Sequence, residues 1–239
     1  MKATNDVLNI LRKTELFEGI SNKVLFKLAG SFKIKQYKQK EVIFAKNNLS
    51  SELYIVLDGF VKIYEPIKNK KRAYSYVGPA KIFGEFALLG DGVRVVSAEA
   101  VTDITVIVIS KNVFFGIIKE YPAVGLNIAC LVSAKMQNAY KEIVQIAFLN
   151  LPRRIALLLL NLCTAYGKKT KYGRKLALKL NHNDIAELAG TTRETVVRVC
   201  SKLRKLNHIN YYDKNIEIID EKKIMEFIDN DTHKNWTRK

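Results

Sequence analysis

The first part of the chain has a helical pattern of apolar residues over positions 3–30. Leu8 and Leu11 fall on one face of a helix, because residues three or four apart meet on the same side. Ser21 has the side chain of a helix N-cap, and Gly30 is placed to end a second helix. The pattern therefore predicts short helices at the beginning of the chain.

Between residues 32 and 109 the apolar period changes to two, and turn residues recur at short intervals. Asp58-Gly59 predicts a hairpin turn between two strands, the charged segment 68–71 a loop tip, and Gly78-Pro79 another turn. Many short strands at even spacing predict a small antiparallel β-barrel or jelly roll. The predicted strands are rich in Val, Ile, Tyr and Phe: Glu41–Ala45, Leu53–Leu57, Phe60–Tyr64, Ala73–Val77 and Ile104–Ile109.

An apolar segment, Phe83–Arg94, carries a Gly-Glu pair and a single arginine inside this region. Glu85–Leu89 is predicted to form a short helical turn that exposes backbone N–H groups, and Arg94 adds a fork-shaped cation. Together they would form a phosphate cradle, with Glu85 as an acceptor for a pair of hydroxyl groups. From the residue chemistry alone, an ordinary surface turn with an exposed glutamate and arginine explains the segment better.

A long helix is predicted from Pro122 to Leu149, after a shorter helix at residues 111–119. A helix that is apolar over so much of its surface needs a partner, most simply a second copy of the same chain. Packing against the strands of its own chain is a compatible alternative. The residues that approximate one seam are Ile128, Leu131, Lys135, Ala139, Ile143 and Ile146.

The helical pattern is interrupted at residues 148–152, where we expect a domain boundary and hinge. Asn150 can cap a new helix that has Pro152 in its first turn and continues to Ala165. A Gly- and Lys-rich hairpin or loop follows at Tyr166–Lys179.

A helix-turn-helix is predicted at residues 181–203. Asn181 can cap the first helix, and Gly190 can end it in a left-handed conformation. Either Thr191 or Thr192 can cap the second helix. Beyond this motif, Ile209–Tyr212 and Ile216–Ile219 predict a two-stranded wing around residues 213–215, Glu221–Ile228 predicts a short helix, and residues 229–239 a frayed polar tail.

The second helix of this motif has one apolar and one polar face. Val196, Val199 and Leu203 fall on the buried side. An arginine fork can bind O6 and N7 of guanine, and a glutamate can accept from cytosine N4, so the polar face suits a major groove. A helical hairpin with a solvated charged face is the alternative. The polar face carries Arg193, Glu194, Val197, Arg198 and Ser201, in which Glu194 and Arg198 have the spacing of an ion pair.

The composition is strongly basic, with 40 Lys and Arg against 23 Asp and Glu and a net charge of +17. Such a charge favours nucleic acid or another anionic surface as the partner. Residues 167–205 alone carry 11 Lys or Arg against 3 acidic residues. No apolar run approaches the roughly 18 residues of a membrane span, and no signal peptide pattern is present. We therefore expect a cytoplasmic protein that has no membrane partner.

The chemistry-bearing residues predict neither a metal site nor an enzyme. Cys130, Cys163 and Cys200 are odd in number and far apart, so we expect reduced, mostly buried thiols without metal-ligand spacing. A lone cysteine on an apolar helix, such as Cys130, is more often part of a core. No pairing of nucleophile and base and no carboxylate pair stands out, so we expect no catalytic residue.

A sensor barrel, a long helix, a hinge and a winged helix-turn-helix follow one another, and in this order the chain resembles the cyclic AMP receptor protein and fumarate-nitrate regulator superfamily of bacterial transcription factors. The most specific segments are Phe83–Arg94, Ala147–Ala156 and Asn183–Leu203. The resemblance implies an α+β chain with a cyclic-nucleotide-binding-like barrel at residues 1–121, a dimerisation helix at 122–149 and a winged helix-turn-helix at 150–239.

The resemblance also implies roles for individual residues. Arg193, Glu194 and Arg198 would bind base edges. The residues that would contact DNA phosphates are His182, Thr192, Thr195 and Lys202. The effector site would comprise Gly84 and Glu85 at the ribose of a cyclic nucleotide, Arg94 at its phosphate, and Phe86 and Val95 beside them.

The chain departs from cyclic AMP binders in two segments. Val95-Val96 follows Arg94 where those proteins have a small hydroxyl residue and alanine, and residues 138–141 read Asn-Ala-Tyr-Lys where they offer Thr-Ser to the adenine. The implied effector is a small molecule, with cyclic AMP as one candidate. An iron–sulfur cluster needs several cysteines near the N-terminus, and haem needs a His, Cys or Met at the barrel. We expect neither group. The first cysteine is Cys130, and the three histidines, His182, His208 and His233, all lie in the C-terminal part of the chain.

The implied function is that of a homodimeric, effector-controlled transcription regulator, such as an activator that contacts RNA polymerase. It would bind double-stranded DNA at inverted repeats with half-sites like TGTGA. The alternative is a cyclic-nucleotide-binding regulatory module of a signalling protein that does not bind DNA. The predicted helix-turn-helix at residues 181–203 argues against this alternative, because such modules lack one.

Overall fold

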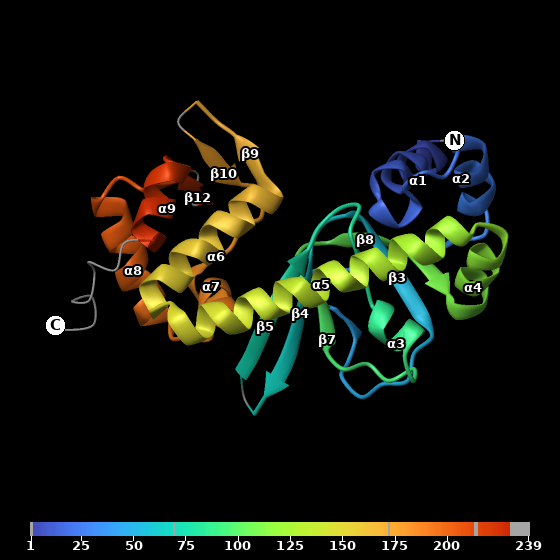
Figure 1. Cartoon of the computed structure of the whole chain (residues 1–239), viewed down its shortest axis with the longest axis horizontal. Helices are drawn as coiled ribbons and strands as arrows, with labels where there is room; N and C mark the ends of the chain where they lie inside the picture. Colours follow the sequence, from blue (N-terminus) through green and yellow to red (C-terminus); the bar gives the residue numbers. More distant parts are fainter. Residues whose placement is uncertain (1, 69, 172, 213–214, 230–239) are drawn as a thin grey trace. The chain divides into compact units, whose positions relative to one another are not determined.

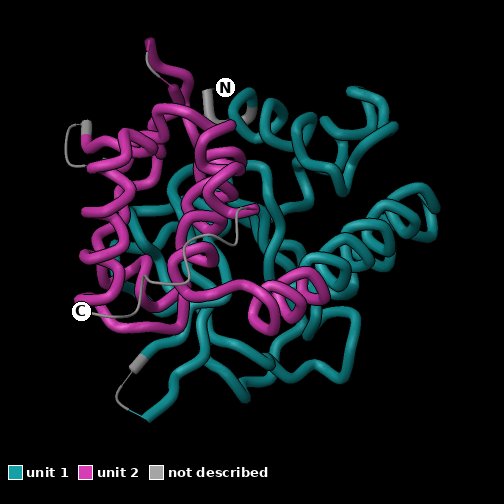
Figure 2. The backbone as a smooth tube through the Cα atoms, turned by 60° about the vertical axis from the view of Figure 1, so that its left-hand side comes forward, with its two compact units in different colours: residues 1–138 teal, residues 139–239 magenta. Residues whose placement is uncertain are grey.

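The computed structural model describes residues 2–68, 70–171, 173–212 and 215–229. The chain forms two compact units, residues 1–138 and 139–239, shown in two colours in Figure 2. The boundary between the units lies within one long helix, α5 (Pro122–Phe148). The division predicted from the sequence, at residues 121 and 149, separates a sensor, a dimerisation helix and a DNA-binding domain. It concerns functional roles and stays a prediction, whereas the two units are defined by their internal contacts.

The helices of the first unit begin and end close to where the sequence predicts. Ser21 caps α2, with its hydroxyl accepting from the N–H of Val24, and Ser110 caps α4 in the same way at Val113. Figure 1 shows α1 and α2 beside α4, at the N-terminal end of α5. These helices are α1 (Lys2–Lys13), the 3₁₀ turn η1 (Glu15–Phe17), α2 (Asn22–Ala29), α3 (Glu85–Leu89) and α4 (Lys111–Glu120).

Two four-stranded antiparallel sheets form the centre of this unit and confirm the predicted jelly-roll-like architecture. The first has the order β1 (Lys33–Tyr37), β8 (Ile104–Ser110), β3 (Glu52–Asp58), β6 (Ile82–Phe83). The second has the order β2 (Val42–Phe44), β7 (Ser97–Ala100), β4 (Val61–Ile67), β5 (Lys70–Val77). Strands β1, β6 and β7 were not predicted individually, because β6 has two residues and β1 and β7 contain few β-branched or aromatic side chains.

The turn at Asp58-Gly59 is present, but the predicted hairpin is wrong. Strand β3 pairs with β8 and β6, whereas β4 pairs with β7 and β5, so the turn connects two different sheets. Gly59 has φ +85°, and a Cβ there would lie 2.5 Å from the carbonyl oxygen of Asp103. A turn dipeptide fixes a local change of direction, but the burial of whole strands decides their pairing. The hairpin in this region joins β4 to β5, and Asn69 in its loop tip lies outside the described residues.

Two apolar clusters stabilise the unit. One lies on the side of β3 that carries Tyr54 and Val56, together with Phe44 and Phe83. The other combines the opposite side of β3 with the helices. Both faces of β3 are therefore buried, which explains its continuous apolar sequence. The second cluster includes Leu11, Leu25, Leu53, Ile107, Phe114 and Ile128.

The predicted seam of α5 divides into a buried and an exposed part. Ile128 belongs to the helix-side cluster and is 4% exposed, so it faces its own unit, as the alternative of packing within the chain predicts. Leu131 is partly buried against the same cluster, and its place in a dimer seam stays a prediction. Ile143 is 62% exposed and Ile146 is 52% exposed. Cys130 is exposed as well, contrary to the expectation of a core cysteine. The first apolar residues of the predicted seam pack against their own unit, whereas the last ones are exposed to solvent.

Among the described residues, no single helix is long and apolar enough to cross a membrane. Only the pair α4 and α5, bent by 118° at their junction, passes such a test by length and composition.

The second unit contains the helix-turn-helix and a four-stranded antiparallel sheet with the order β11-β12-β10-β9. The predicted two-stranded wing is thus extended by the hairpin that precedes the motif. Residues 213–214, Tyr172 and the tail from 230 onward, including His233, lie outside the described residues. The elements are α6 (Leu151–Tyr166), β9 (Gly167–Lys169), β10 (Arg174–Leu176), α7 (His182–Ala189), α8 (Arg193–Lys205), β11 (Ile209–Tyr212), β12 (Asn215–Ile218) and α9 (Glu221–Asp229).

Helix α6 is capped as predicted, because the Asn150 side chain accepts from the backbone N–H of Arg153 at 3.2 Å. The buried side of α6 carries Ile155, Ala156 and Leu159, and the helix packs against α7, α8 and α9. The sequence motif therefore lies on a small but complete apolar core.

Candidate DNA-binding surface and effector site

The first helix of the motif, α7, begins with a capping box. The side-chain oxygen of Asn181 accepts from the N–H groups of Asn183 and Asp184, and Asp184 accepts from the N–H of Asn181 at 2.9 Å. Gly190 ends the helix at φ 64° and ψ 45°, as its position in the sequence predicts. These local contacts fix both ends of α7.

The second helix, α8, is capped by Thr192 and not by Thr191. The Thr192 hydroxyl accepts from the N–H of Thr195 at 3.3 Å. On the inner side of the helix pair, Ile185, Val196 and Leu203 are fully buried. Arg154 of α6 donates to the carbonyl oxygen of Ala189 at 3.0 Å, which satisfies a carbonyl at the end of α7. The outer face of α8 is thus presented by a rigid support.

The outer face of α8 displays the residues that the sequence predicts for base recognition. Arg193, Glu194 and Arg198 are exposed, as are Ser201 and Lys202. Within the described chain, Arg198 makes no ion pair with Glu194, although their spacing allows one. Hydrogen bonds from the backbone N–H of Glu194 and from the Thr192 side chain lower the pKa of the Glu194 carboxyl. The arginine forks are therefore available to a ligand outside the protein.

His182, the first residue of α7, is half-buried and already bonded within the unit. Its Nε2 lies 2.9 Å from the hydroxyl oxygen of Tyr211 on β11, and the two rings meet edge to face. Burial, and to a smaller extent the Arg193 cation, lower the pKa of His182. The sequence did not single out Tyr211, because nothing in a linear pattern brings a wing strand to the start of α7.

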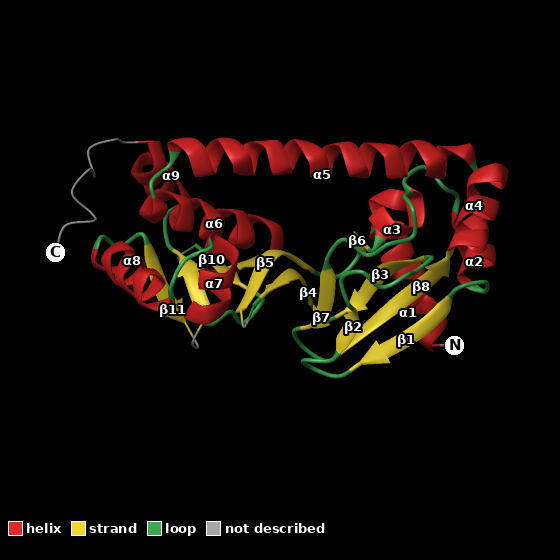
Figure 3. Cartoon of the chain, turned by 90° about the horizontal axis from the view of Figure 1, so that it is seen from below, coloured by secondary structure: helices red, strands yellow, loops and turns green. Residues whose placement is uncertain are grey.

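The predicted effector residues Gly84, Glu85 and Arg94 come together beside α3, which Figure 3 shows between the sheets and α5. Gly84 has φ +83°, and a Cβ there would lie 2.6 Å from Nη1 of Arg94. Glycine is required here because the arginine fork occupies the space above it.

Arg94 is only 2% exposed, so the alternative of a surface turn is wrong. Its Nη1 donates to the carbonyl oxygen of Gly84 at 2.6 Å, and its Nη2 donates to the carbonyl oxygen of Glu52 at 2.8 Å and to the Ser50 hydroxyl at 2.5 Å. The guanidinium carbon lies 4.0 Å from the centroid of the Phe44 ring. The arginine is therefore held by four residues that precede it by 10 to 50 positions in the sequence.

The charge of Arg94 is incompletely compensated. Among the described residues it forms no ion pair with a carboxylate, and its Nε is buried without a hydrogen-bond partner. Burial lowers its pKa, against the opposing effects of Tyr54, Glu52 and Glu85. A buried cation with an unmet donor is an unfavourable arrangement unless an anion comes close to it, so the donor set suits a phosphate.

Glu85 is likewise buried, at 2% exposure, and its Oε1 accepts from Nζ of Lys135 on α5 at 2.7 Å. The same ammonium group also donates to the carbonyl oxygen of Ile82 at 3.3 Å. Lys135 was predicted only as a member of the α5 seam, and its distance from Glu85 in the sequence hid this role. Phe86 and Val95 lie outside this buried group and are 50% and 55% exposed.

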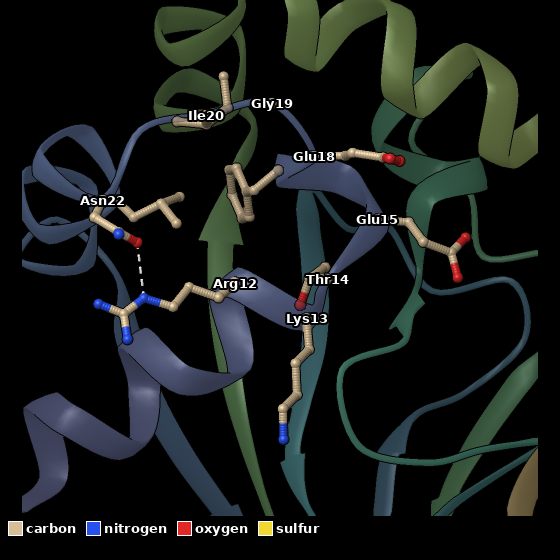
Figure 4. A pocket seen from close by; sticks show the side chains of 10 residues that line it. Arg12, Lys13, Thr14, Glu15, Glu18, Gly19, Ile20 and Asn22 are labelled. Carbon is tan, nitrogen blue, oxygen red and sulfur yellow. Dashed lines mark hydrogen bonds between the residues drawn. The ribbon is translucent and has the colours of Figure 1, made fainter.

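Other groups do not extend the site. Within the described ranges there is no cluster of three or more His, Cys, Asp or Glu residues that could hold a metal ion. Burial raises the pKa of Cys163 to about 12 and that of Cys200 to about 11, which keeps both as thiols. A pocket between α1, η1 and α2 contains none of the predicted site residues, and in it Arg12 is bonded to Asn22 at 2.8 Å (Figure 4).

Two protein-family models match the chain. The cyclic nucleotide-binding domain matches residues 34–121, and the Crp-like helix-turn-helix domain matches residues 153–227. Together they account for more than half of the chain, and α1, α2 and α5 lie outside both. The first contains the Arg94 cradle and the second contains α7, α8 and both hairpins.

Individual proteins support the same assignment. A cyclic AMP receptor protein from Thermus thermophilus is 29% identical over 194 residues, which cover 81% of this chain and 87% of that protein. A transcriptional regulator of the CRP/FNR family from the same organism has a TM-score of 0.69 at 26% identity, covering 83% of this chain and 99% of that one. A CooA mutant from Carboxydothermus hydrogenoformans matches with a TM-score of 0.72, 24% identity and coverage of 83% and 88%, which shows the shared fold.

Proposed function

Because the chain belongs to the cyclic AMP receptor protein and fumarate-nitrate regulator superfamily of DNA-binding transcription regulators, we propose that it works as a cytoplasmic homodimer on inverted-repeat DNA. The observation that carries this proposal is the exposed face of α8, where three long polar side chains stand on a rigid helix and, in the described part of the chain, Glu194 and Arg198 form no ion pair. RNA polymerase is the proposed protein partner, and no catalytic role is proposed.

In this proposal the N-terminal half of α8 enters the major groove. Arg193 and Arg198 bind guanine through O6 and N7, and Glu194 accepts from cytosine N4. The lowered pKa of the Glu194 carboxyl keeps it an acceptor at neutral pH. Thr192, Thr195, His182 and Lys202 contact phosphates on either side and set the position of the helix in the groove.

For the effector we propose an anionic small molecule of the cyclic nucleotide class. Its phosphate would lie against the Arg94 guanidinium, whose buried Nε lacks a partner among the described residues, and its hydroxyl groups would bond Glu85 next to Gly84. Phe86 and Val95 would form the outer edge of the site. The Thermus relative is described as a cyclic AMP receptor protein, but Val95-Val96 follows the arginine here, so cyclic AMP is one candidate among cyclic nucleotides.

The dimer interface is proposed along the exposed side of α5. A row of exposed residues has alternating spacings of four and three, which is the heptad pattern of a two-stranded coiled coil. At its centre, Met136 is 54% and Tyr140 is 59% exposed. The row comprises Ala129, Ser133, Met136, Tyr140, Ile143 and Ala147.

Replacing Met136 and Ile143 together with Asp tests this interface without touching the unit's own core. We expect monomers in analytical ultracentrifugation and loss of tight binding to an inverted repeat, because two buried carboxylates in a coiled-coil seam are strongly unfavourable. Lys141→Asp is the matched control, since it introduces the same side chain on the same helix outside the row. A double variant that stays fully dimeric would place the interface elsewhere.

The function as a whole is tested by selecting binding sites from random double-stranded DNA with the purified full chain, with and without cyclic AMP, cyclic GMP and cyclic dinucleotides. We expect inverted repeats whose half-site centres are about one helical turn apart. Recovery of unrelated sequences, at the frequencies of the input pool, would contradict sequence-specific binding.

A further inference from the structure

The hydroxyl group of Tyr211 lies where three elements of the second unit meet. It is 2.9 Å from Nε2 of His182, at the start of α7, and it also interacts with the side chain of Cys200, in the middle of α8, which after burial contributes to the raised pKa of Tyr211. Tyr211 itself belongs to the wing strand β11. One hydroxyl group therefore connects both helices of the motif to the wing.

The surroundings hold this group in place. Cys200 is 1% exposed and lies on the buried side of α8. The guanidinium carbon of Arg204, one turn further along α8, lies 6.0 Å from the centroid of the Tyr211 ring. The ring of His182 meets the ring of Tyr211 at 73° with 6.0 Å between their centroids. The Tyr211 hydroxyl therefore lies between two possible hydrogen-bond partners, an imidazole nitrogen and a thiol.

All three groups are uncharged at neutral pH. Burial is the main cause that lowers the pKa of His182 and raises the pKa of both Cys200 and Tyr211. A neutral imidazole has one N–H and one bare nitrogen. The bare nitrogen is a much better acceptor than a thiol sulfur, so the single Tyr211 proton goes to Nε2 and the thiol donates to the tyrosine oxygen. With Nε2 as the acceptor, the imidazole proton resides on Nδ1.

The Nδ1 atom is accessible from outside. No described residue forms a hydrogen bond with this nitrogen, and it is not one of the buried polar atoms that lack a partner. It is therefore exposed to solvent. The neighbouring backbone N–H groups of Asn183 and Asp184 are already bonded to the Asn181 side chain. At the beginning of α7, the ring of His182 is therefore a remaining donor for a phosphate.

We propose that Tyr211 is a positioning residue for DNA binding: its hydroxyl holds His182 in the tautomer with the proton on Nδ1, so that His182 donates a neutral hydrogen bond to a DNA phosphate. This inference rests on the proposed function, in which His182 contacts the DNA backbone. It adds the wing strand to the phosphate-binding machinery. It also predicts that the affinity contributed by this contact does not depend on salt, because a neutral donor releases no counterion from the DNA.

This property separates His182 from Lys202 in a salt titration. Loss of a lysine contact to phosphate lowers the slope of log affinity against log salt by about one per contact. Loss of a neutral donor weakens binding to all sequences but leaves the slope unchanged. Tyr211→Phe should act like the second case, since it removes one oxygen and leaves the ring in place.

The test combines two measurements on the full chain. Long-range ¹H–¹⁵N NMR spectra of the histidine rings report which nitrogen carries the proton, with His182 assigned by its loss in His182→Gln. We expect Nδ1–H in the wild type and a shift toward Nε2–H in Tyr211→Phe. DNA affinity in Tyr211→Phe should fall about fivefold per half-site, at an unchanged salt slope, and should fall no further when Tyr211→Phe is added to His182→Gln.

Tyr74→Phe is the matched control, because it removes a hydroxyl bonded to Glu65 in the other unit, and it should change neither measurement. A wild-type His182 with its proton on Nε2 would overturn the proposal, and this result requires no variant to fold. An equal loss of DNA affinity from Tyr211→Phe in the wild-type and His182→Gln backgrounds would also overturn it, because the loss would then come from packing and not from His182. A wild type that binds no specific DNA would contradict the proposed function, while the tautomer would still decide the role of Tyr211.

Discussion

The exposed face of α8 and the buried cradle around Arg94 use the same side chain in opposite ways. On α8, Arg198 is exposed. In the described part of the chain it forms no ion pair with Glu194, which lies one turn away on the same helix. In the cradle, Arg94 is 2% exposed and donates to three oxygen atoms of its own chain. The first site is ready to bind before a ligand arrives, whereas the second is largely satisfied internally.

This difference has a consequence for each site. A rigid, uncommitted donor loses little on binding, so its contact contributes directly to affinity and to sequence preference. At the cradle both Nη atoms of Arg94 are already bonded and only its Nε is not, so a ligand that uses the whole fork must rearrange the existing hydrogen bonds. Because Glu85 is tied to Lys135 on α5, such a rearrangement reaches the helix that is proposed to form the dimer. In the proposed function, DNA recognition therefore belongs to α8 and switching belongs to the cradle.

The largest effect is expected from Arg198→Ala, which removes an uncommitted donor. A lost bidentate base contact costs about 1–3 kcal/mol per half-site and relaxes the preference at one base pair. Two half-sites in a dimer double this cost. Site selection by the wild type and the variant at fixed salt measures both the affinity and the base preferences.

Lys202→Ala is the control for this variant, since a phosphate contact should weaken all sequences alike. If Arg198→Ala selected the same sites with the same base preferences, α8 would not be the helix that reads the DNA.

Two smaller effects are expected from Arg94→Ala in the cradle, one on ligand binding and one on stability. Binding of cyclic nucleotides should be lost in titration calorimetry, because no other cation lies in the segment from Phe83 to Val96. The variant should also unfold more easily by about 1–3 kcal/mol, because the oxygens of Gly84 and Glu52 lose a charged donor. An exposed arginine such as Arg198 should show no such loss of stability.

Arg94→Lys sharpens this result. A lysine keeps the charge but cannot donate to three oxygens with fork geometry, so we expect partial stability without effector binding. A wild type that binds none of cyclic AMP, cyclic GMP or cyclic dinucleotides would show that the barrel responds to a different class of molecule.

The smallest effect is expected from Lys135→Met, which removes the partner of a buried carboxylate. Stability in urea unfolding should fall by about 1–2 kcal/mol, because the Glu85 carboxyl stays buried at 2% exposure after its lysine donor is removed. The double variant with Glu85→Gln should recover part of this loss, since the charge is then gone. DNA affinity of the effector-free protein is the control and should stay the same. Additive losses in the two single variants would show that Lys135 and Glu85 are not coupled.

The two sites also differ in how much of them the sequence could predict. The helix-turn-helix depends on contacts within a few residues, such as the Asn181 capping box and the Thr192 cap, so composition and period were enough to locate it. In the cradle, the sequence identified Gly84, Glu85 and Arg94 but not Ser50, Glu52 or Lys135. These partners lie about forty residues before or after it and carry no mark of their function.

Residue patterns along the chain were enough to predict most element boundaries, the antiparallel sheets and the exposed polar face of α8, because these follow from side-chain period and from hydrogen bonds between near neighbours. The folded chain was needed to show that the Asp58-Gly59 turn joins two sheets, that Ile128 faces its own unit, and that Arg94 and Tyr211 bond to distant partners. A linear pattern specifies which side of an element is apolar, whereas the packing of the whole unit decides which other element covers that side.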